Sequence, residues 1–237
     1  MRAVSFSVSA KQRLTHHDLD RFPGDTLFAR IARAACAAGV LPRKELHEAW
    51  EVARRTRRQC RGGRVVDVAG GHGLLAHVLL LLDDTSPAAH VVDPAPPASA
   101  VALHDALVAA WPRLGGRIHT HAVPLDAFPL AAGDVVVSSH ACGALTDLVL
   151  DAAAAARAAV AVLPCCHDVE TCHAGPLTGW MDAPLAIDAR RALRLEQRGY
   201  RVWTQTIPAT ITPKNRLLLG VPAEATPAGG GASSEAE

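Results

Sequence analysis

The segment VVDVAGGHG, residues 65–73, determines the expected fold, because a short valine-rich run passes directly into a glycine-rich turn. Runs of β-branched residues favour buried strands. The leucine-rich segment over residues 72–82 suits a helix packed inside the protein. Glycine permits a sharp turn and leaves room for a ligand, since it has no side chain. This order predicts the first strand, turn and helix of an α/β sheet, whose ligands bind at the carboxyl ends of the strands.

The rest of the chain alternates short apolar runs with longer runs rich in alanine and leucine. Strands are expected over residues 64–68, 90–93, 117–123, 134–139, 159–164, 200–207 and 215–221, and further helices over 98–111, 143–157 and 188–199. The last two strands are joined without a helix, which forces them to be antiparallel. The sequence therefore predicts a Rossmann-like seven-stranded sheet, mostly parallel, with one antiparallel C-terminal strand.

Three regions are expected along the chain. Residues 1–60 form an N-terminal helical extension, in which apolar residues recur at helical spacing. Residues 61–221 form the α/β domain. Residues 222–237 are of low complexity, with small and polar side chains that cannot build a core, and are expected to be disordered.

The composition is that of a globular protein, and its small net charge gives no general attraction to charged partners. Of 237 residues, 49% are hydrophobic and 20% are charged, and the net charge is only +1, so the whole protein does not attract nucleic acid or membranes. The N-terminal stretch lacks the apolar segment of a secretory signal, and the run VLLLL is too short to cross a bilayer. We expect a cytoplasmic protein with no membrane contact, and the sequence gives no oligomeric state.

Two acidic residues follow later strands, where a bound nucleoside would be held. Asp93 closes the second strand, 20 residues after Gly73, where a carboxylate can accept hydrogen bonds from ribose hydroxyls. Asp126 follows the third strand. Two cofactor classes fit. A nicotinamide or flavin dinucleotide fits because Gly71-x-Gly73-x-x-Ala76 is a permitted variant of its fingerprint, and this would make the protein an NAD(P)-dependent oxidoreductase. The other class is S-adenosylmethionine.

The first turn favours the second class, because Asp67 and the glycines after it resemble the D-x-x-x-G-x-G motif of class I methyltransferases. A terminal antiparallel strand is also typical of that family. The resemblance implies S-adenosylmethionine as the cofactor, with Asp126 beside the adenine amino group. Ala69 is a departure, since many members have glycine there. The cofactor-binding residues implied in this way are Asp67, Ala69, Gly70, Gly71, Gly73, Asp93 and Asp126.

Two further motifs follow the fourth and fifth strands. HACGALTDL, residues 140–148, and LPCCHD, residues 163–168, resemble a methyltransferase subfamily that includes the eukaryotic tRNA ribose 2′-O-methyltransferases. The resemblance implies RNA as the methyl acceptor, although the zinc-binding segments of the tRNA enzymes have no counterpart here. Methylation of a protein or small molecule, and a non-catalytic protein that binds through the same fold, stay open as alternatives. The matching positions are His140, Cys142, Gly143, Thr146, Asp147, Cys165, Cys166 and His167.

Methyl transfer requires an aligned acceptor and often a base that removes its proton. His140 and His167 are the candidate bases, because histidine titrates near neutral pH. Asp147 is a candidate for orienting the substrate or a histidine, or it is a carboxylate on the surface of a helix. Cys142 and Cys165 complete the candidate catalytic set, since RNA cytosine-C5 methyltransferases carry cysteines after the same two strands.

The cysteines after these strands have three interpretations. We favour small apolar residues that line the pocket, and on this interpretation the protein has no metal site. A metal site is the second, with Cys142, Cys165, Cys166, His167, Cys172 and His173 as available ligands, although adjacent cysteines do not have the spacing of zinc knuckles. Covalent catalysis is the third.

The segment RRTRRQCRGGR, residues 54–64, carries six arginines and no acidic residue. It is either a phosphate-binding face for RNA or a solvated helix end, where cations suit the helix dipole. We favour the solvated end, because runs of charge are usually solvated. Aromatic residues make up only 4% of the chain, which offers little for stacking on bases.

Overall fold

The computed structural model describes residues 6–223 and contains one seven-stranded sheet, in the order β3-β2-β1-β4-β5-β7-β6. Strands β1 to β5 pair in parallel, and β7 runs antiparallel to both of its neighbours, β5 and β6. The mostly parallel sheet with one antiparallel C-terminal strand is thus confirmed. Most of the predicted disordered tail, residues 224–237, lies outside the described residues.

The elements follow the predicted order, with short 3-10 turns added between them. The strands are β1 (Val65–Val68), β2 (Ala89–Val92), β3 (Ile118–His121), β4 (Val135–Ser138), β5 (Ala159–Val162), β6 (Tyr200–Thr206) and β7 (Arg216–Pro222). The helices are α1 (Leu27–Ala38), α2 (Arg43–Gln59), α3 (Leu74–Leu82), α4 (Ala100–Ala110), α5 (Ala144–Ala156) and α6 (Ala183–Gln197). The 3-10 helices are η1 (His16–Arg21), η2 (Pro112–Leu114), η3 (Leu125–Ala127) and η4 (Gly175–Gly179).

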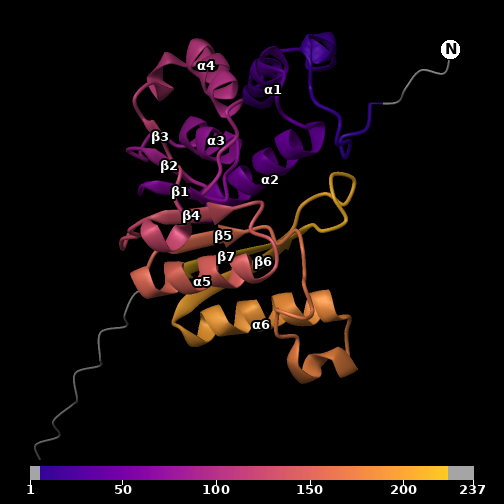
Figure 1. Ribbon diagram of the computed structural model, residues 1–237, viewed down its shortest axis with the longest axis vertical. Coiled ribbons are helices and arrows are strands. Elements are labelled where there is room, and N and C mark those ends of the chain that lie inside the picture. The colour runs from indigo at the N-terminus through magenta and orange to yellow at the C-terminus, as the bar shows by residue number, and fades with distance from the viewer. Residues whose placement is uncertain (1–5, 224–237) are drawn as a thin grey trace, which may run out of the picture.

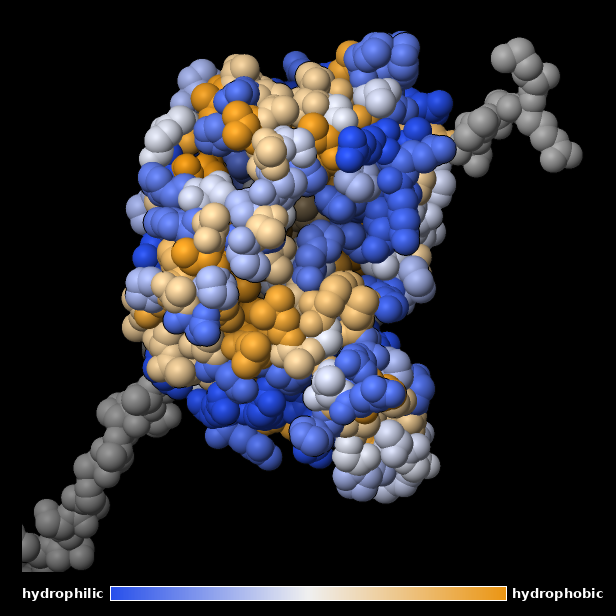
Figure 2. All heavy atoms as spheres, in the orientation of Figure 1, coloured by the Kyte–Doolittle hydropathy of each residue, from blue (hydrophilic) through white to orange (hydrophobic). Residues whose placement is uncertain are grey.

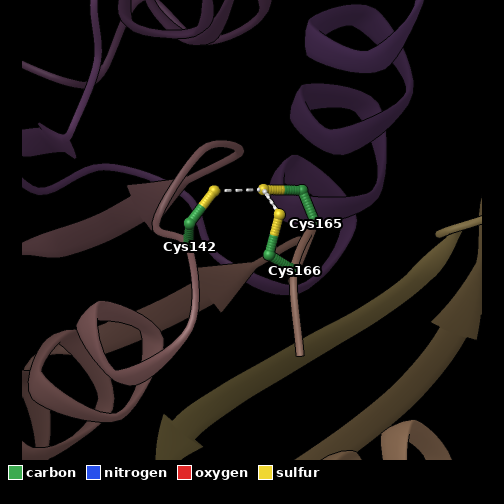
Figure 3. A group of neighbouring side chains, drawn as sticks. All are labelled: Cys142, Cys165 and Cys166. Carbon is green, nitrogen blue, oxygen red and sulfur yellow. Dashed lines mark hydrogen bonds between the residues drawn. The ribbon is translucent and has the colours of Figure 1, made fainter. Parts of the chain in front are cut away.

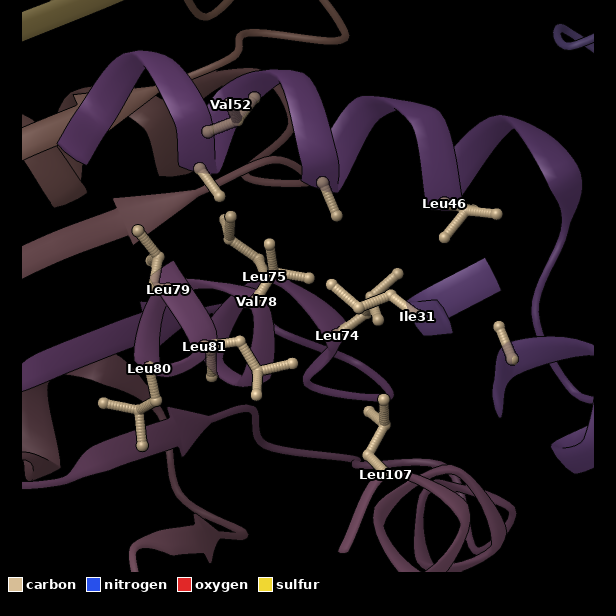
Figure 4. Close-up of a cluster of buried hydrophobic side chains, with 14 of the residues drawn as sticks. Ile31, Leu46, Val52, Leu74, Leu75, Val78, Leu79, Leu80, Leu81 and Leu107 are labelled. Atoms are coloured by element: carbon tan, nitrogen blue, oxygen red, sulfur yellow. The ribbon is translucent and has the colours of Figure 1, made fainter. Parts of the chain in front are cut away.

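The sheet has a hydrophobic core on each face, because successive side chains of a strand point to opposite sides. Val65 and Val91 belong to the core under α1 to α4, whereas Val66 and Val92 belong to the core under α5 and α6. Figure 1 shows these two groups of helices on opposite sides of the sheet. In Figure 4, Leu46 and Val52 of α2 face the leucines of α3. The N-terminal helices therefore share one core with the α/β sheet.

Local signals explain where two helices begin. Thr26 caps α1 by accepting a hydrogen bond from the Ala29 N–H at 3.2 Å. Helix α6 begins at Ala183, five residues before the predicted start at 188, because Asp182 accepts from the Leu185 N–H at 2.8 Å and Pro184 follows in the first turn. The prediction missed this cap. None of the helices in residues 6–223 is long and apolar enough to cross a membrane.

Candidate functional site

A cavity of about 400 Å³ opens at the carboxyl ends of β1, β2 and β4. Its lining combines the glycine-rich turn, the ends of two neighbouring strands and one side of the N-terminal helices. The polar and glycine residues of the wall are Glu45, Asp67, Gly70, Gly71, His72, Asp93, Ser139 and His140. Five of the seven predicted cofactor-binding residues line this cavity, and Gly73 and Asp126 do not.

The glycines of the turn serve two different purposes. A Cβ on Gly70 would lie 2.8 Å from a methyl of Val91 and 2.9 Å from the Asp67 carboxyl carbon, and one on Gly73 would lie 2.7 Å from Val91. These two glycines let the turn pack against β1 and β2. Gly71 has φ +52° and nothing within 4 Å of its Cβ position, so its backbone faces open space in the cavity.

Ala69 adopts a left-handed conformation with φ +53°, in which a side chain is strained. This explains why glycine is common at this position in the family that the turn resembles. The backbone is held there because the Ala69 N–H donates to the carbonyl oxygen of Val92 at 2.8 Å. The departure from glycine is therefore tolerated at a local cost in backbone strain.

Asp93 connects the second strand to the glycine turn. Its Oδ2 accepts a hydrogen bond from the Gly71 N–H at 3.0 Å, and its Oδ1 accepts from the Ala95 N–H at 2.9 Å. Each carboxylate oxygen has two acceptor sites, so one remains on each oxygen for hydroxyl groups of a ligand. Asp93 thus shapes the turn and offers acceptors to the cavity.

Asp67 lies under the turn and is almost fully buried. Its Oδ2 accepts from the Ala76 N–H at 3.2 Å, which holds the first turn of α3 to the end of β1. Burial, together with the charge of Asp93, raises the pKa of this carboxyl from 3.8 to about 7, and the hydrogen bond from Ala76 opposes the rise. Asp67 therefore supports the floor of the cavity.

We expect Asp67→Asn to change how stability depends on pH. The unfolded carboxyl loses its proton above its ordinary pKa of 3.8, whereas the folded one keeps it to about 7, so the protein loses stability as the pH rises through this window. The variant cannot ionise at this position and has no such loss. The difference in free energy of unfolding, variant minus unchanged protein, should therefore rise by about 2–4 kcal/mol as the pH increases across this window.

Denaturant unfolding of both proteins at a series of pH values measures this difference. His77, whose pKa burial lowers to about 4, titrates in the same range but is present in both proteins and cancels. A difference that does not vary with pH would show that Asp67 ionises normally in the folded protein.

Two polar side chains at the end of β4 face the cavity. Ser139 is buried, and its hydroxyl oxygen has no hydrogen-bond partner among the described residues. An unpaired buried hydroxyl is costly, and a ligand can satisfy it. His140 beside it is exposed on the concave wall. The pKa of its imidazole is lowered because the protein around the ring removes it from water, and the positive charge of Lys44 lowers the pKa further. A neutral His140 can accept a proton near neutral pH.

Glu45 and Ala49 of α2, with Leu41 from the link before it, close one side of the cavity. Burial raises the pKa of Glu45, and the neighbouring Glu48 adds to the effect. Sequence analysis did not assign residues of this region, or Ser139, to the site. The packing of α2 on α3 brings Glu45 and Ala49 there, whereas the pairing of β4 with β1 places Ser139.

His167 and Asp147 belong to a buried ionic network instead of the cavity wall. The His167 Nε2 lies 2.8 Å from both carboxylate oxygens of Asp188. Arg191, which is 2% exposed, pairs with Asp188 at 3.2 Å and with Asp147 at 2.6 Å. Arg191 also donates to the Gly143 carbonyl oxygen at 3.0 Å. The network therefore ties α6 to the loops after β4 and β5, and the structure does not bring His167 beside His140 in the cavity.

Asp126 lies in η3, after β3, and is exposed. It is not among the residues that line the cavity. Its predicted place beside the adenine comes from the resemblance and stays a prediction.

Three cysteines from the two motif loops lie close together. The sulfur atoms of Cys142 and Cys165 lie 2.8 Å apart, and those of Cys165 and Cys166 lie 3.8 Å apart (Figure 3). Hydrogen bonding to Cys142 lowers the pKa of the Cys166 thiol, and the charges of Lys214 and Lys44 contribute. Burial raises the pKa of the Cys165 thiol. Cys172 is buried elsewhere, against Arg191 at 3.5 Å.

The arginine-rich segment is engaged within the protein. Arg57 is buried and donates to the Leu79 carbonyl oxygen at 3.2 Å and to the Ser86 hydroxyl at 2.7 Å. Such pairing leaves little of the continuous basic face that a phosphate backbone needs. Four of the six arginines have acidic partners, Arg54 and Arg55 with Glu51, Arg57 with Asp83, and Arg64 with Asp134.

Comparison with solved structures identifies the fold. An O-methyltransferase family protein from Burkholderia thailandensis superposes with a TM-score of 0.52 and 19% identity over 89% of this chain and 63% of that one. The S-adenosylmethionine-dependent methyltransferase SibL, in its apo form, superposes with a TM-score of 0.51 and 20% identity over 87% of this chain and 65% of that one.

The chain has a methyltransferase fold. It spans less than two thirds of the length of both chains, and at this identity the likeness concerns the fold alone. No family model matches the chain, and no curated protein matches it. In the methyltransferase fold, the cavity lies at the sheet edge where α/β sheets bind their ligands.

Proposed function

We propose that the protein is an S-adenosylmethionine-dependent methyltransferase. The observation that carries the proposal is the convergence of Gly71, Asp93 and Ser139 on one cavity at the carboxyl edge of a methyltransferase fold. Gly71 gives a backbone that a ligand can approach, Asp93 has free acceptor capacity, and Ser139 has an unsatisfied hydroxyl. This donor and acceptor set fits a nucleoside with an amino-acid tail.

S-adenosylmethionine would supply a methyl group activated by a positively charged sulfur. In this proposal Asp93 accepts hydrogen bonds from the ribose hydroxyls, and Gly71 leaves room for the ligand. Ser139 pairs with a polar group of the ligand. His140, held neutral by its surroundings, takes the proton of the acceptor. Cys142 and Cys165 stay candidates for contact with the acceptor.

The leading acceptor is RNA, which rests on the resemblance of HACGALTDL and LPCCHD to the tRNA enzymes. The small net charge and the internally paired arginines offer no further support for RNA. An O-methyltransferase family protein is among the similar structures, so a small molecule is the second acceptor class.

Calorimetric titration with S-adenosylmethionine, and separately with NAD, tests the cofactor. We expect one molecule of S-adenosylmethionine to bind per chain with micromolar affinity and NAD to bind more weakly. Tighter binding of NAD, or no binding of S-adenosylmethionine, would contradict the proposal.

Transfer of a labelled methyl group into cell extract tests the reaction. Label removed by ribonuclease would identify RNA as the acceptor, and label that resists both ribonuclease and protease would identify a small molecule. A His140→Ala variant should bind the cofactor and lose transfer, because His140 is assigned to the acceptor's proton and not to the cofactor.

A further inference from the structure

The loops after β4 and β5 bring three thiols into one group. The sulfurs of Cys142, Cys165 and Cys166 all lie within 4.8 Å of one another. Figure 3 shows the three side chains pointing toward a common centre, although Cys142 comes from a different loop than the other two. Chain neighbours alone do not produce this arrangement, because 23 residues separate Cys142 from Cys165.

Both loops are held in place by the rest of the protein. The Gly143 N–H donates to the Cys166 carbonyl oxygen at 3.2 Å and joins one loop to the other. The Thr146 hydroxyl donates to the Ala141 carbonyl oxygen at 2.6 Å, beside Cys142. The Arg191 guanidinium donates to the Gly143 carbonyl oxygen at 3.0 Å. The backbone that carries the thiols is thus fixed before any ligand arrives.

We propose that Cys142, Cys165 and Cys166 bind a zinc ion as a three-thiolate site with one open coordination position. Zinc prefers thiolate ligands at about 2.3 Å in a tetrahedral arrangement, which places two ligand sulfurs about 3.8 Å apart. Cys165 and Cys166 already have this spacing of 3.8 Å. The Cys142 sulfur lies closer to that of Cys165, at 2.8 Å, and the Cys142 side chain is exposed, so zinc binding would require it to rotate outward.

The three sulfur ligands and the positive charges near them favour zinc over other metal ions. Three sulfurs suit zinc, whereas magnesium and calcium require oxygen ligands. Lys44 and Lys214 place positive charge beside Cys166 and offset the net negative charge of a trithiolate zinc site. Among residues 6–223 this group contains only these three ligands, and Cys142 and Cys166 are exposed, so solvent or an acceptor can reach the fourth position.

Titration of the full chain with Co²⁺, after removal of metal and reduction with a phosphine, tests the site. We expect one equivalent of Co²⁺ to produce a thiolate-to-cobalt charge-transfer band, which zinc then abolishes. The band should be lost in Cys142→Ser, Cys165→Ser and Cys166→Ser. The matched control is Cys36→Ala, which changes a buried cysteine outside the group and should keep the band.

Absence of the band from the reduced protein would overturn the site, and so would a band that survives all three serine variants. None of the three cysteines lines the cavity, which removes the support for the favoured interpretation of them as pocket-lining residues. Loss of the zinc site would therefore leave S-adenosylmethionine binding unchanged, and the two proposals fail separately.

Discussion

Replacing Arg191 by methionine should lower the free energy of unfolding by about 1.5–3 kcal/mol, because Asp147 and Asp188 lose their buried hydrogen-bond donor. Asp147 keeps Arg194 at 2.9 Å and Asp188 keeps Arg216 at 2.7 Å, both more exposed than Arg191. Arg191 is 2% exposed and pairs with Asp147 and Asp188, whose side chains are 26% and 11% exposed. Methionine keeps the apolar stem and removes only the guanidinium. Thermal unfolding should show a midpoint lower by roughly 5 °C for a chain of this size.

Arg194→Met is the matched control, on the same helix and one turn away. Arg194 also pairs with Asp147, at 2.9 Å, but its side chain is 36% exposed and solvent screens the pair. We expect a loss of at most about 1 kcal/mol. Figure 2 shows hydrophilic residues gathered over the lower end of the molecule, where α6 lies in the same view of Figure 1. Equal losses in the two variants would mean that burial of Arg191 has no special importance.

The effect of Arg191→Met should also depend on pH. Burial by itself raises the pKa of Asp147, but the pair with Arg191 outweighs it, and the pKa is lowered below its ordinary 3.8. A lowered carboxyl pKa contributes stability above the ordinary value that is lost as the pH falls through the folded pKa. The difference between the variant and the unchanged protein should therefore shrink in acid.

Replacing Asp93 by alanine should weaken binding of S-adenosylmethionine by about 10- to 100-fold, since a hydrogen bond to a charged group contributes about 1.5–3 kcal/mol. The loss has two sources. The ribose hydroxyls lose their acceptor, and the Gly71 N–H, now 3.0 Å from Asp93, loses the partner that fixes the turn. Calorimetric titration measures the affinity, and thermal unfolding checks that the variant folds.

Asp126→Ala makes the same change at a carboxylate outside the cavity lining. The cavity lining, which lacks Asp126, leads us to expect unchanged affinity, whereas the resemblance to methyltransferases predicts a loss. A tenfold loss in Asp126→Ala would instead support its predicted place beside the adenine. Unchanged affinity in a folded Asp93→Ala would contradict the assignment of Asp93 to the ribose.

Much of the fold could be predicted because its signals are local. The valines of β1, the glycine turn and the leucines of α3 follow one another directly, and each has a clear preference. The short link between β6 and β7 allowed only an antiparallel pair. The early start of α6 was missed because its cap, Asp182, follows a 3-10 segment with no helical period of its own.

The sequence by itself determined the sheet, the place of the glycine turn and the position of Asp93 beside it, because strand order and connection length constrain them. Only the tertiary structure showed which of the two histidines lines the cavity. His140 and His167 follow neighbouring strands in similar motifs, and nothing local separates them. Packing of α6 brings Asp188 against His167 and leaves His140 in the cavity. The same long-range packing gathers the three thiols, because contacts between distant segments depend on the whole fold.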